Sequence, residues 1–347
     1  MYQQPYHKKD LGSFHFLITG GAGFIGSNIV EYLLKYGAGK VRVLDNFSTG
    51  SIDNLSDFLD NPALELIEGD IRDLNTCQRA VEGIHFVSHQ AALGSVPRSI
   101  DDPITSNDVN VSGFLNMLVA AQKSAVTKMV YAASSSTYGD SPELPKVEEK
   151  IGNPLSPYAI TKYVNELYAS VFSRQYGFHT IGLRYFNVFG PRQNPQGPYA
   201  AVIPLFITAA LRHNTTYING DGETSRDFTF VENAVQANIK ALLSSGIDEH
   251  QVVNIAFGER TTLNELWEGI TGLLEMNLKP KYREFRAGDV KHSLASVSKA
   301  KDLIGYEPLV SVKDGLKKSV DWYKRQNSTA KVSEHNLTAQ SAGRLIS

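Results

Sequence analysis

The sequence has a single cysteine, no excess of either charge and no long apolar run. Cys77 is the only cysteine among 347 residues, so an internal disulfide is excluded. Lysine and arginine total 34 against 36 aspartates and glutamates, and the basic residues are scattered, which argues against a nucleic-acid partner. No run approaches the ~18 apolar residues of a membrane span, and the N-terminus lacks a signal-peptide core. We expect a cytoplasmic protein with neither a membrane partner nor a metal site.

Short apolar runs alternate with helix-like segments through the first half of the chain. The first run ends in a glycine-rich turn, and an amphipathic segment follows from Ser27 to Tyr36. The apolar runs occupy residues 14–19, 40–45, 64–68, 85–89, 128–133 and 180–184. This alternation predicts an α/β fold built on a doubly wound parallel sheet, the Rossmann arrangement.

Gly20, Gly23 and Gly26 lie where the first run gives way to a helix. Glycines at this spacing allow a tight turn, a close approach to a pyrophosphate and exposed amides at the helix N-terminus. A tight turn without a ligand is the alternative. Asp45 ends the second run, where a carboxylate can accept the ribose hydroxyls of NAD and would repel the 2′-phosphate of NADP. We therefore predict NAD as the cofactor.

Two further strand ends should contribute to the same site. Asp70 and Ile71 follow the third run, and we place them near the adenine. A turn or an N-cap aspartate is the alternative explanation for Asp70. Gln90-Ala-Ala92 follows the fourth run and should line the middle of the cofactor.

Tyr158 and Lys162 are one helical turn apart, directly after a helix-start signal. Ser156 suits an N-cap and Pro157 the first helical position, so we predict a helix that runs to about Tyr176. Residues four apart share one helix face, and a cation beside a phenol can lower its ordinary pKa of about 10. Such a phenol could act as a base toward an alcohol. An ordinary exposed tyrosine and lysine are the alternative.

A hydroxyl cluster follows the fifth apolar run. Ser134, Ser135 and Ser136 precede Thr137-Tyr138-Gly139, at the sheet edge where ligands of such folds bind. Together, the glycine turn, Asp45, this cluster and the Tyr158–Lys162 pair resemble the extended short-chain dehydrogenase/reductase family. Segments 90–98, 183–190, 219–228 and 286–293 further resemble UDP-hexose 4-epimerases, particularly the UDP-N-acetylglucosamine 4-epimerase group.

The resemblance implies roles for individual residues. It makes Ser134 the catalytic hydroxyl, Tyr158 the base, and Lys162 the residue that binds the nicotinamide ribose and lowers the pKa of the tyrosine. The NAD site that we predict comprises Gly20, Gly23, Phe24, Ile25, Gly26, Asp45, Asn46, Gly50, Asp70, Ile71, Gln90, Ala91, Ala92, Tyr158 and Lys162.

The substrate residues also follow from the resemblance. Arg226 and Arg286 are expected at the diphosphate, with Asn187 and Asp289 beside them at the diphosphate and the uridine ribose; structural salt bridges are the alternative for the arginines. The uracil would be held by Val202, Tyr217 and Asn219. The sugar and its acetamido arm would lie against Gly94, Ser95, Ser134, Ser135, Ser136, Gln193 and Ser298.

The expected domain division follows the same pattern. We assign residues 1–190 to an NAD-binding Rossmann domain, to which residues 228–257 return with a further strand. Residues 191–327 should form a smaller, interleaved, mixed α/β domain that binds the UDP-sugar. The polar tail at 328–347 has little apolar periodicity and is expected to be weakly ordered.

The serine cluster also separates related activities. Sugar-nucleotide 4,6-dehydratases of this family carry an Asp-Glu pair where this chain has Ser135 and Ser136, and a serine is a poor acid or base for expelling water. We therefore predict an NAD-dependent enzyme that interconverts UDP-N-acetylglucosamine and UDP-N-acetylgalactosamine through a 4-keto sugar, with UDP-glucose and UDP-galactose as a further pair. A UDP-hexuronic acid 4-epimerase, with Arg98 or Arg192 near the carboxylate, and a non-catalytic NAD sensor are the alternatives.

The resemblance also implies an assembly. By the resemblance, two helices at 108–123 and 157–175 would pair in a homodimer.

Overall fold

The computed structural model describes residues 1–196, 199–285 and 291–343, from residue 329 onward as backbone only. Its centre is a seven-stranded, wholly parallel sheet with the strand order β11-β6-β5-β4-β1-β2-β3. These strands are β1 (His15–Thr19), β2 (Lys40–Asp45), β3 (Leu64–Glu68), β4 (Phe86–His89), β5 (Lys128–Ser134), β6 (Thr180–Tyr185) and β11 (Gln251–Ile255). The predicted doubly wound parallel sheet is confirmed.

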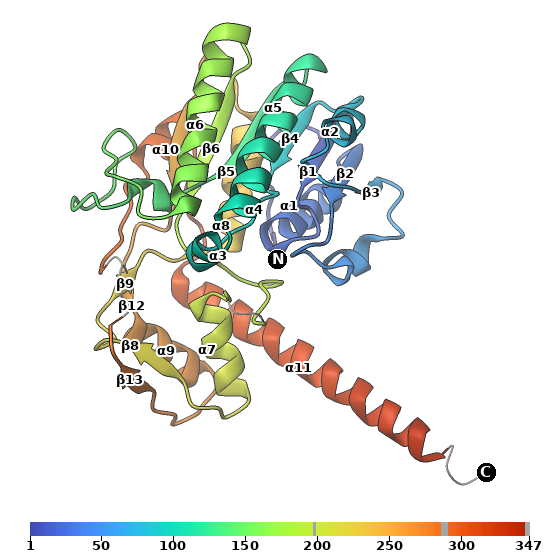
Figure 1. Ribbon diagram of the computed structural model, residues 1–347. Helices are drawn as coiled ribbons and strands as arrows, with labels where there is room; N and C mark the ends of the chain where they lie inside the picture. Colours follow the sequence, from blue (N-terminus) through green and yellow to red (C-terminus); the bar gives the residue numbers. More distant parts are fainter. Residues whose placement is uncertain (197–198, 286–290, 344–347) are drawn as a thin grey trace.

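Helices cover both faces of this sheet (Figure 1). Those that pack around it are α1 (Phe24–Lys35), η1 (Ile52–Phe58), α2 (Leu74–Val81), α3 (Val96–Asp101), α4 (Pro103–Asn107), the π-helical η2 (Asp108–Gly113), α5 (Phe114–Lys123), η3 (Ser135–Tyr138), α6 (Pro157–Tyr176), α8 (Val231–Leu243) and α10 (Ser298–Ile304). α1 begins at Phe24, three residues before the expected start, because Gly23 is already its N-cap.

Two buried cores hold this sandwich together, one on each side of the sheet. Successive side chains of a strand point to opposite faces, so Phe16 and Ile18 enter one core while Leu17 enters the other. Helices α1, α8 and α10 contribute side chains to the first core, and helices α2, α5 and α6 contribute side chains to the second. The strands are therefore buried on both faces, as expected of apolar runs in a parallel sheet.

A smaller group of elements lies beyond the carboxyl ends of the strands (Figure 1). It comprises β7 (Val188–Phe189), α7 (Val202–Leu211), β8 (Tyr217–Asn219), β9 (Ser225–Arg226), β10 (Thr229–Phe230), β12 (Thr261–Thr262), α9 (Leu263–Leu273), β13 (Lys281–Arg283) and the start of α11 (Val312–Gly343). Its core contains Phe206, Trp267 and Ile270. The mixed α/β character expected of the second region is confirmed.

Helix α11 continues to Gly343 and so extends into the tail at 328–347, whose weak order stays a prediction. The helix projects away from the rest of the molecule (Figure 1). We expected residues 228–257 to return to the main sheet with a further strand. In this range, β11 lies at the edge of the sheet and is hydrogen-bonded to β6. The exact domain boundaries stay predictions.

Candidate active site

The turn between β1 and α1 brings three backbone segments into close contact. The Gly20 N–H donates to the Leu44 carbonyl at 2.8 Å, and Gly20 has a left-handed φ of 66°. A Cβ atom at position 20 would lie 2.7 Å from the Ala91 nitrogen, and one at position 26 would overlap the Gly20 carbonyl. Glycine is therefore required at both positions by steric crowding.

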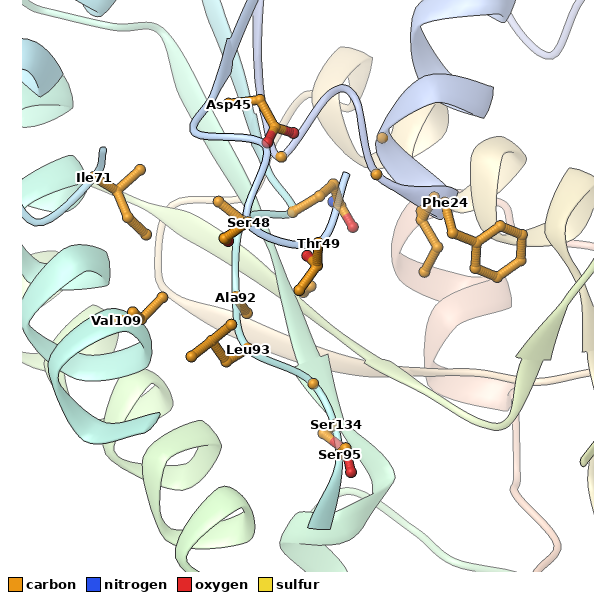
Figure 2. A pocket seen from close by; sticks show the side chains of 18 of the residues that line it. Phe24, Asp45, Ser48, Thr49, Ile71, Ala92, Leu93, Ser95, Val109 and Ser134 are labelled. Atoms are coloured by element: carbon orange, nitrogen blue, oxygen red, sulfur yellow. The ribbon is translucent and has the colours of Figure 1, made fainter. Parts of the chain in front are cut away.

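A cavity of about 530 Å³ extends from this turn across the carboxyl ends of the strands. Figure 2 shows Asp45 near one end of it and Ser134 with Ser95 near the other. Every residue of the predicted NAD site lines it except Gly50: Gly20, Gly23, Phe24, Ile25, Gly26, Asp45, Asn46, Asp70, Ile71, Gln90, Ala91, Ala92, Tyr158 and Lys162. Gly50 does not line the cavity, but a Cβ added to it would lie 3.1 Å from Oδ2 of Asp45, which does.

The Asp45 carboxylate is buried and held by backbone donors. Its two oxygens accept hydrogen bonds from the N–H groups of Ala22 and Phe47, both at 2.9 Å. Burial raises the pKa of Asp45, and these hydrogen bonds act against that rise. The carboxylate thus has a fixed orientation at the end of β2, where the ribose of a dinucleotide is expected.

Asp70 was predicted to lie near the adenine, with a turn or an N-cap aspartate as the alternative, and the structure agrees in part with each. It lines the cavity, yet its carboxylate accepts a hydrogen bond from the Arg72 N–H at 2.8 Å and pairs with the Arg72 guanidinium at 2.8 Å. The hydrogen bonds from Arg72 lower the pKa of Asp70 to about 2. Asn46 also donates to it at 2.8 Å. Asp70 is therefore a turn aspartate that also faces the cavity.

The cavity fits a dinucleotide on structural grounds. Gly23 is the N-cap of α1 and makes no side-chain cap hydrogen bond, so no side chain competes for the amides of the first helical turn. Such amides, with the helix dipole, favour a bound phosphate. Gly20, Gly23 and Gly26 line the cavity without side chains of their own, and Asp45 lies at the next strand end.

Ser134 ends β5 and is 8% exposed. Its Oγ accepts hydrogen bonds from the Ser136 N–H at 3.1 Å and the Ser136 hydroxyl at 2.9 Å. It also makes a side-chain hydrogen bond with the Tyr158 phenol. A serine hydroxyl and a tyrosine hydroxyl therefore meet at the point where the strand ends.

Helix α6 presents Tyr158 and Lys162 to the same point, and its predicted start is confirmed. The Ser156 hydroxyl accepts a hydrogen bond from the Ala159 N–H at 3.2 Å, and the Tyr158 N–H donates to the Ser99 hydroxyl at 3.0 Å. The Lys162 ammonium lies 5.9 Å from the centre of the Tyr158 ring.

The electrostatics of this pair differ from the expectation. Burial raises the pKa of Tyr158, and the hydrogen bond with Ser134 acts in the opposite direction. Burial lowers the pKa of Lys162 to about 8. The expected lowering of the tyrosine pKa by the lysine is not observed: burial of the phenol is the largest influence on its pKa and raises it, and only the hydrogen bond with Ser134 lowers it.

A second cavity of about 370 Å³ adjoins the first. Ser134, Ser135 and Asn187 line both cavities, so the two meet at the serine cluster. Ser136 and Arg226 also line the second cavity, whereas Gly94, Ser95 and Gln193 line the first. Ser95 has a left-handed φ of 101°, a strained conformation of a kind that recurs at functional sites.

Four predicted substrate residues line neither cavity within the described part of the chain. Val202 begins α7, and Ser298 begins α10. Tyr217, which is 52% exposed, and Asn219 lie on β8, where Arg283 covers the tyrosine ring and donates to Asn219 Oδ1 at 2.5 Å. Arg286 and Asp289 fall outside the described residues. Their roles stay predictions.

Sequence reasoning missed several lining residues. The first cavity is also lined by Leu93, Val109 and Tyr185, and the second by Val96, Pro97, Ile100, Lys146, Leu155 and Phe186. Leu93 directly follows Gln90-Ala-Ala92, so its place after β4 was a usable signal. Lys146 and Leu155 lie in a long loop with no periodicity, and nothing in the sequence indicated that they return to the site.

Within the described residues, no group of three or more histidine, cysteine, aspartate or glutamate side chains could hold a metal ion. The same part of the chain contains no helix that is long and apolar enough to cross a membrane. Cys77 is buried, and burial raises the pKa of its thiol to about 12, which leaves it a poor nucleophile.

Comparison with known proteins gives consistent matches. The model of the NAD dependent epimerase/dehydratase family matches residues 16–256. A putative UDP-glucose 4-epimerase from Methanocaldococcus jannaschii is 38% identical over 315 residues, 90% of this chain and 99% of the relative. The structure of UDP-N-acetylglucosamine 4-epimerase from Methanobrevibacter ruminantium M1, in complex with UDP-N-acetylmuramic acid, is 39% identical with a TM-score of 0.86, over 90% of this chain and 99% of that one.

A third match contains the cofactor. The UDP-glucose 4-epimerase from Thermus thermophilus, solved in complex with NAD, is 35% identical with a TM-score of 0.80, over 90% of this chain and 99% of that one. The family match and the NAD-bound neighbour confirm NAD as the cofactor. The chain therefore belongs to the NAD dependent epimerase/dehydratase family, in the extended short-chain dehydrogenase/reductase group, as an NAD-dependent isomerase of the UDP-sugar 4-epimerase type.

Proposed function

We propose that the protein interconverts UDP-N-acetylglucosamine and UDP-N-acetylgalactosamine by inverting C4 of the sugar. The observation that carries the proposal is the meeting of the two cavities at Ser134 and Ser135, beside Tyr158 and without a carboxylate in the serine cluster. This arrangement supplies a base for one alcohol but no second acid for elimination.

In the proposed reaction, Tyr158 in its phenolate form takes the proton of the C4 hydroxyl. The Ser134 hydroxyl, hydrogen-bonded to the phenol, steadies that charge and passes the proton. Bound NAD supplies the acceptor, and later the donor, of a hydride at C4. Lys162, whose ammonium lies 5.9 Å from the centre of the Tyr158 ring, provides a positive charge beside the phenol and would bind the cofactor ribose. When the 4-keto sugar has presented its other face, Tyr158 returns the proton and the configuration is inverted.

Open space beside the expected position of the sugar supports the assignment of a substrate with an acetamido group at C2. A Cβ added to Gly94 would meet no atom within 4 Å, and the neighbouring Ser95 is small. Both residues line the cofactor cavity. On this proposal, the plain pair UDP-glucose and UDP-galactose is also accepted, because a smaller C2 hydroxyl fits the same space.

The test is to incubate the purified protein with UDP-N-acetylglucosamine, without added NAD, and to detect the C4 epimer by NMR. The proposal predicts formation of UDP-N-acetylgalactosamine and a slower or comparable reaction of UDP-glucose. Turnover of UDP-glucose alone would correct the sugar assignment. No epimer from any UDP-sugar, with NAD present in the protein, would instead favour the sensor alternative.

A UDP-hexuronic acid 4-epimerase is the second candidate, supported by Lys146. This lysine is 5% exposed and lines the second cavity; its Nζ donates to the Ser141 carbonyl, so a substrate carboxylate would have to bind beside that contact. The cations first considered are less suitable: Arg192 pairs with Glu31, and Arg98 lies over the Tyr199 ring. Comparing UDP-glucuronic acid with UDP-N-acetylglucosamine in the same assay separates the candidates.

We further propose that the protein is a homodimer with α6 at its centre. The side chains of Ile160, Leu167 and Val171 share one face of α6 and are 52%, 49% and 41% exposed. Ile100 on α3 and Ile104 on α4, helices that pack against α6, are 60% and 82% exposed. A contiguous apolar face of this kind is typical of an interface. The cytoplasmic location stays a prediction.

A further inference from the structure

One segment, the loop at residues 187–193, which includes the two-residue strand β7, contributes to both cavities of the active site. Asn187 lines both, and Val188 and Gln193 line the cofactor cavity. The loop is costly to hold in place, because Asn187 and Arg192 have left-handed φ angles of 37° and 68°. Arg192 Nη1 and Gln193 Oε1 are also buried without a hydrogen-bond partner in the described structure. Contacts from elsewhere must therefore stabilise this conformation.

Helix α1 supplies part of those contacts, while Asn187 Nδ2 donates to the Asp227 carbonyl at 3.0 Å and the Tyr323 hydroxyl donates to the Gln193 carbonyl. Asn28 donates a hydrogen bond from Nδ2 to the Pro191 carbonyl at 3.2 Å. One turn further along, Glu31 forms an ion pair with Arg192, and the two side chains are only 18% and 13% exposed. The first turn of the same helix lines the cofactor cavity. α1 thus joins the glycine turn to the loop on the other side of the site.

Residues 1–12, which we call the N-terminal strap, contribute to the orientation of Asn28, together with the Phe24 carbonyl, which accepts a hydrogen bond from Asn28 Nδ2 at 2.8 Å. Tyr2 is fully buried, and its hydroxyl lies 3.1 Å from both the carbonyl oxygen and Oδ1 of Asn28. The single Tyr2 proton is shared between these two oxygens, and its contact with Oδ1 matches the orientation in which Nδ2 is turned toward Pro191. The Tyr36 hydroxyl holds the strap in turn by donating to the Tyr2 carbonyl at 2.8 Å.

The strap is anchored over several residues. The Tyr6 ring stacks on Tyr32 with centroids 5.0 Å apart, and the Tyr6 N–H donates to the Tyr32 hydroxyl at 2.6 Å. His7 Nδ1 lies 2.8 Å from the same hydroxyl. The strap precedes residue 16, where the match to the family model begins. The strap therefore lies outside the matched region, whereas α1, which it contacts, lies within it.

We propose that Tyr2 and Asn28 are positioning residues, which hold the loop at 187–193 in its ligand-binding conformation through the hydrogen bond to Pro191. Neither touches the reacting atoms. Loss of their contacts lets the strained loop relax away from the cavities, so that the affinity for NAD and for the UDP-sugar decreases while the chemical step is unaffected. The NAD part of this proposal is independent of the sugar assigned above, and the sugar part rests on the proposed function.

The experiment compares Tyr2→Phe, Asn28→Ala and the double variant. Tyr2→Phe keeps the buried ring and removes only the hydroxyl, so the fold is maintained. We expect the Kd for NAD, measured by titration of the NAD-free protein, to rise about threefold in Tyr2→Phe and about tenfold in Asn28→Ala, the range of one or two lost hydrogen bonds. The KM for the UDP-sugar should rise together with the Kd for NAD, while kcat stays unchanged.

The matched control is Tyr131→Phe. Tyr131 is equally buried, and its hydroxyl contacts His250 at 3.5 Å in the opposite core, away from the strap. This variant should lower Tm but leave the Kd for NAD unchanged. In the double variant, Tyr2→Phe should add no further loss to Asn28→Ala, because both act through one hydrogen bond.

Two outcomes would overturn the proposal. The first is a lower Tm in Tyr2→Phe with no change in the Kd for NAD or in KM, which would make the contact merely structural. The second is fully additive effects in the double variant. If the protein epimerises no UDP-sugar, the NAD titrations still decide the role of the strap, and that failure would belong to the proposed substrate alone.

Discussion

The Lys162 ammonium lies 5.9 Å from the centre of the Tyr158 ring, one turn along the same helix. It donates to the Ala132 carbonyl at 2.9 Å, and only 3% of the residue is exposed. Burial lowers the pKa of Lys162 to about 8 and raises the pKa of Tyr158, so each group is shifted toward its neutral form. The hydrogen bond with Ser134 is the contact that opposes this shift for the phenol.

Replacing Tyr158 with phenylalanine should remove the base and leave the cavity intact. We expect kcat to fall by about 10²- to 10⁴-fold, the usual contribution of a positioned general base, with little change in the Kd for NAD. The control is Tyr163→Phe, on the same helix but outside both cavities among the described residues. Equal turnover by Tyr158→Phe and Tyr163→Phe would show that another group takes the proton.

The low pKa of Lys162 should be visible in the pH dependence of the reaction. Above about pH 8 the buried ammonium loses its proton. If the reaction requires the positive charge of Lys162, kcat/KM therefore decreases as pH rises above this value. Lys162→Arg retains the charge at these pH values, because a guanidinium is not deprotonated. We expect this variant to be slower but to lack the alkaline decline. A wild-type profile without a decline above that pH contradicts the charge requirement.

His89 should make the protein sensitive to acid. It is 4% exposed beside Lys162, and burial, together with the lysine charge, lowers its pKa to about 3. Between that pH and the ordinary histidine value of about 6.5, the unfolded state binds more protons. The free energy of unfolding therefore decreases as pH falls through this window, by up to about 1.4 kcal/mol per pH unit from this group.

Denaturant unfolding at a series of pH values measures that slope. His89→Gln removes the titrating group and should flatten the dependence, although loss of the 2.8 Å contact with Thr19 Oγ1 lowers stability at all pH values. His213→Gln, at an exposed position, serves as the control and should keep the wild-type slope. An unchanged slope in His89→Gln would mean that other groups cause the acid sensitivity.

Much of the NAD site could be predicted from sequence because its residues are local. Gly20, Asp45 and Gln90 each lie at or just past a strand end, and parallel strands bring their carboxyl ends to one edge. The same logic located Ser134. Helix α6 also begins directly after its N-cap serine, Ser156, and ends at Tyr176, as predicted. In these cases the pattern and the packing agree.

The substrate side depended on contacts that are distant in sequence. Lys146 and Leu155 reach the second cavity from an aperiodic loop, whereas Val202 and Tyr217, which were expected there, do not line it. The direction of the Tyr158 pKa was also inaccessible, since spacing predicts a neighbouring cation but not the extent of desolvation. Nor did sequence patterns indicate that Tyr2 would be fully buried against α1.

The exposed face of α4 and α6 should govern assembly. Ile104 is 82% exposed and Leu167 49% exposed, and burial of such side chains in a dimer would stabilise it by about 1.5–3 kcal/mol each. A charge at either position would have to be desolvated in the interface, so Ile104→Glu and Leu167→Glu should shift the protein from dimer to monomer in light scattering coupled to gel filtration. Leu309→Glu, at a 50% exposed leucine away from these helices, should leave the wild-type mass. A wild-type protein that is monomeric at micromolar concentration would contradict the dimer, and the apolar face would then have another partner.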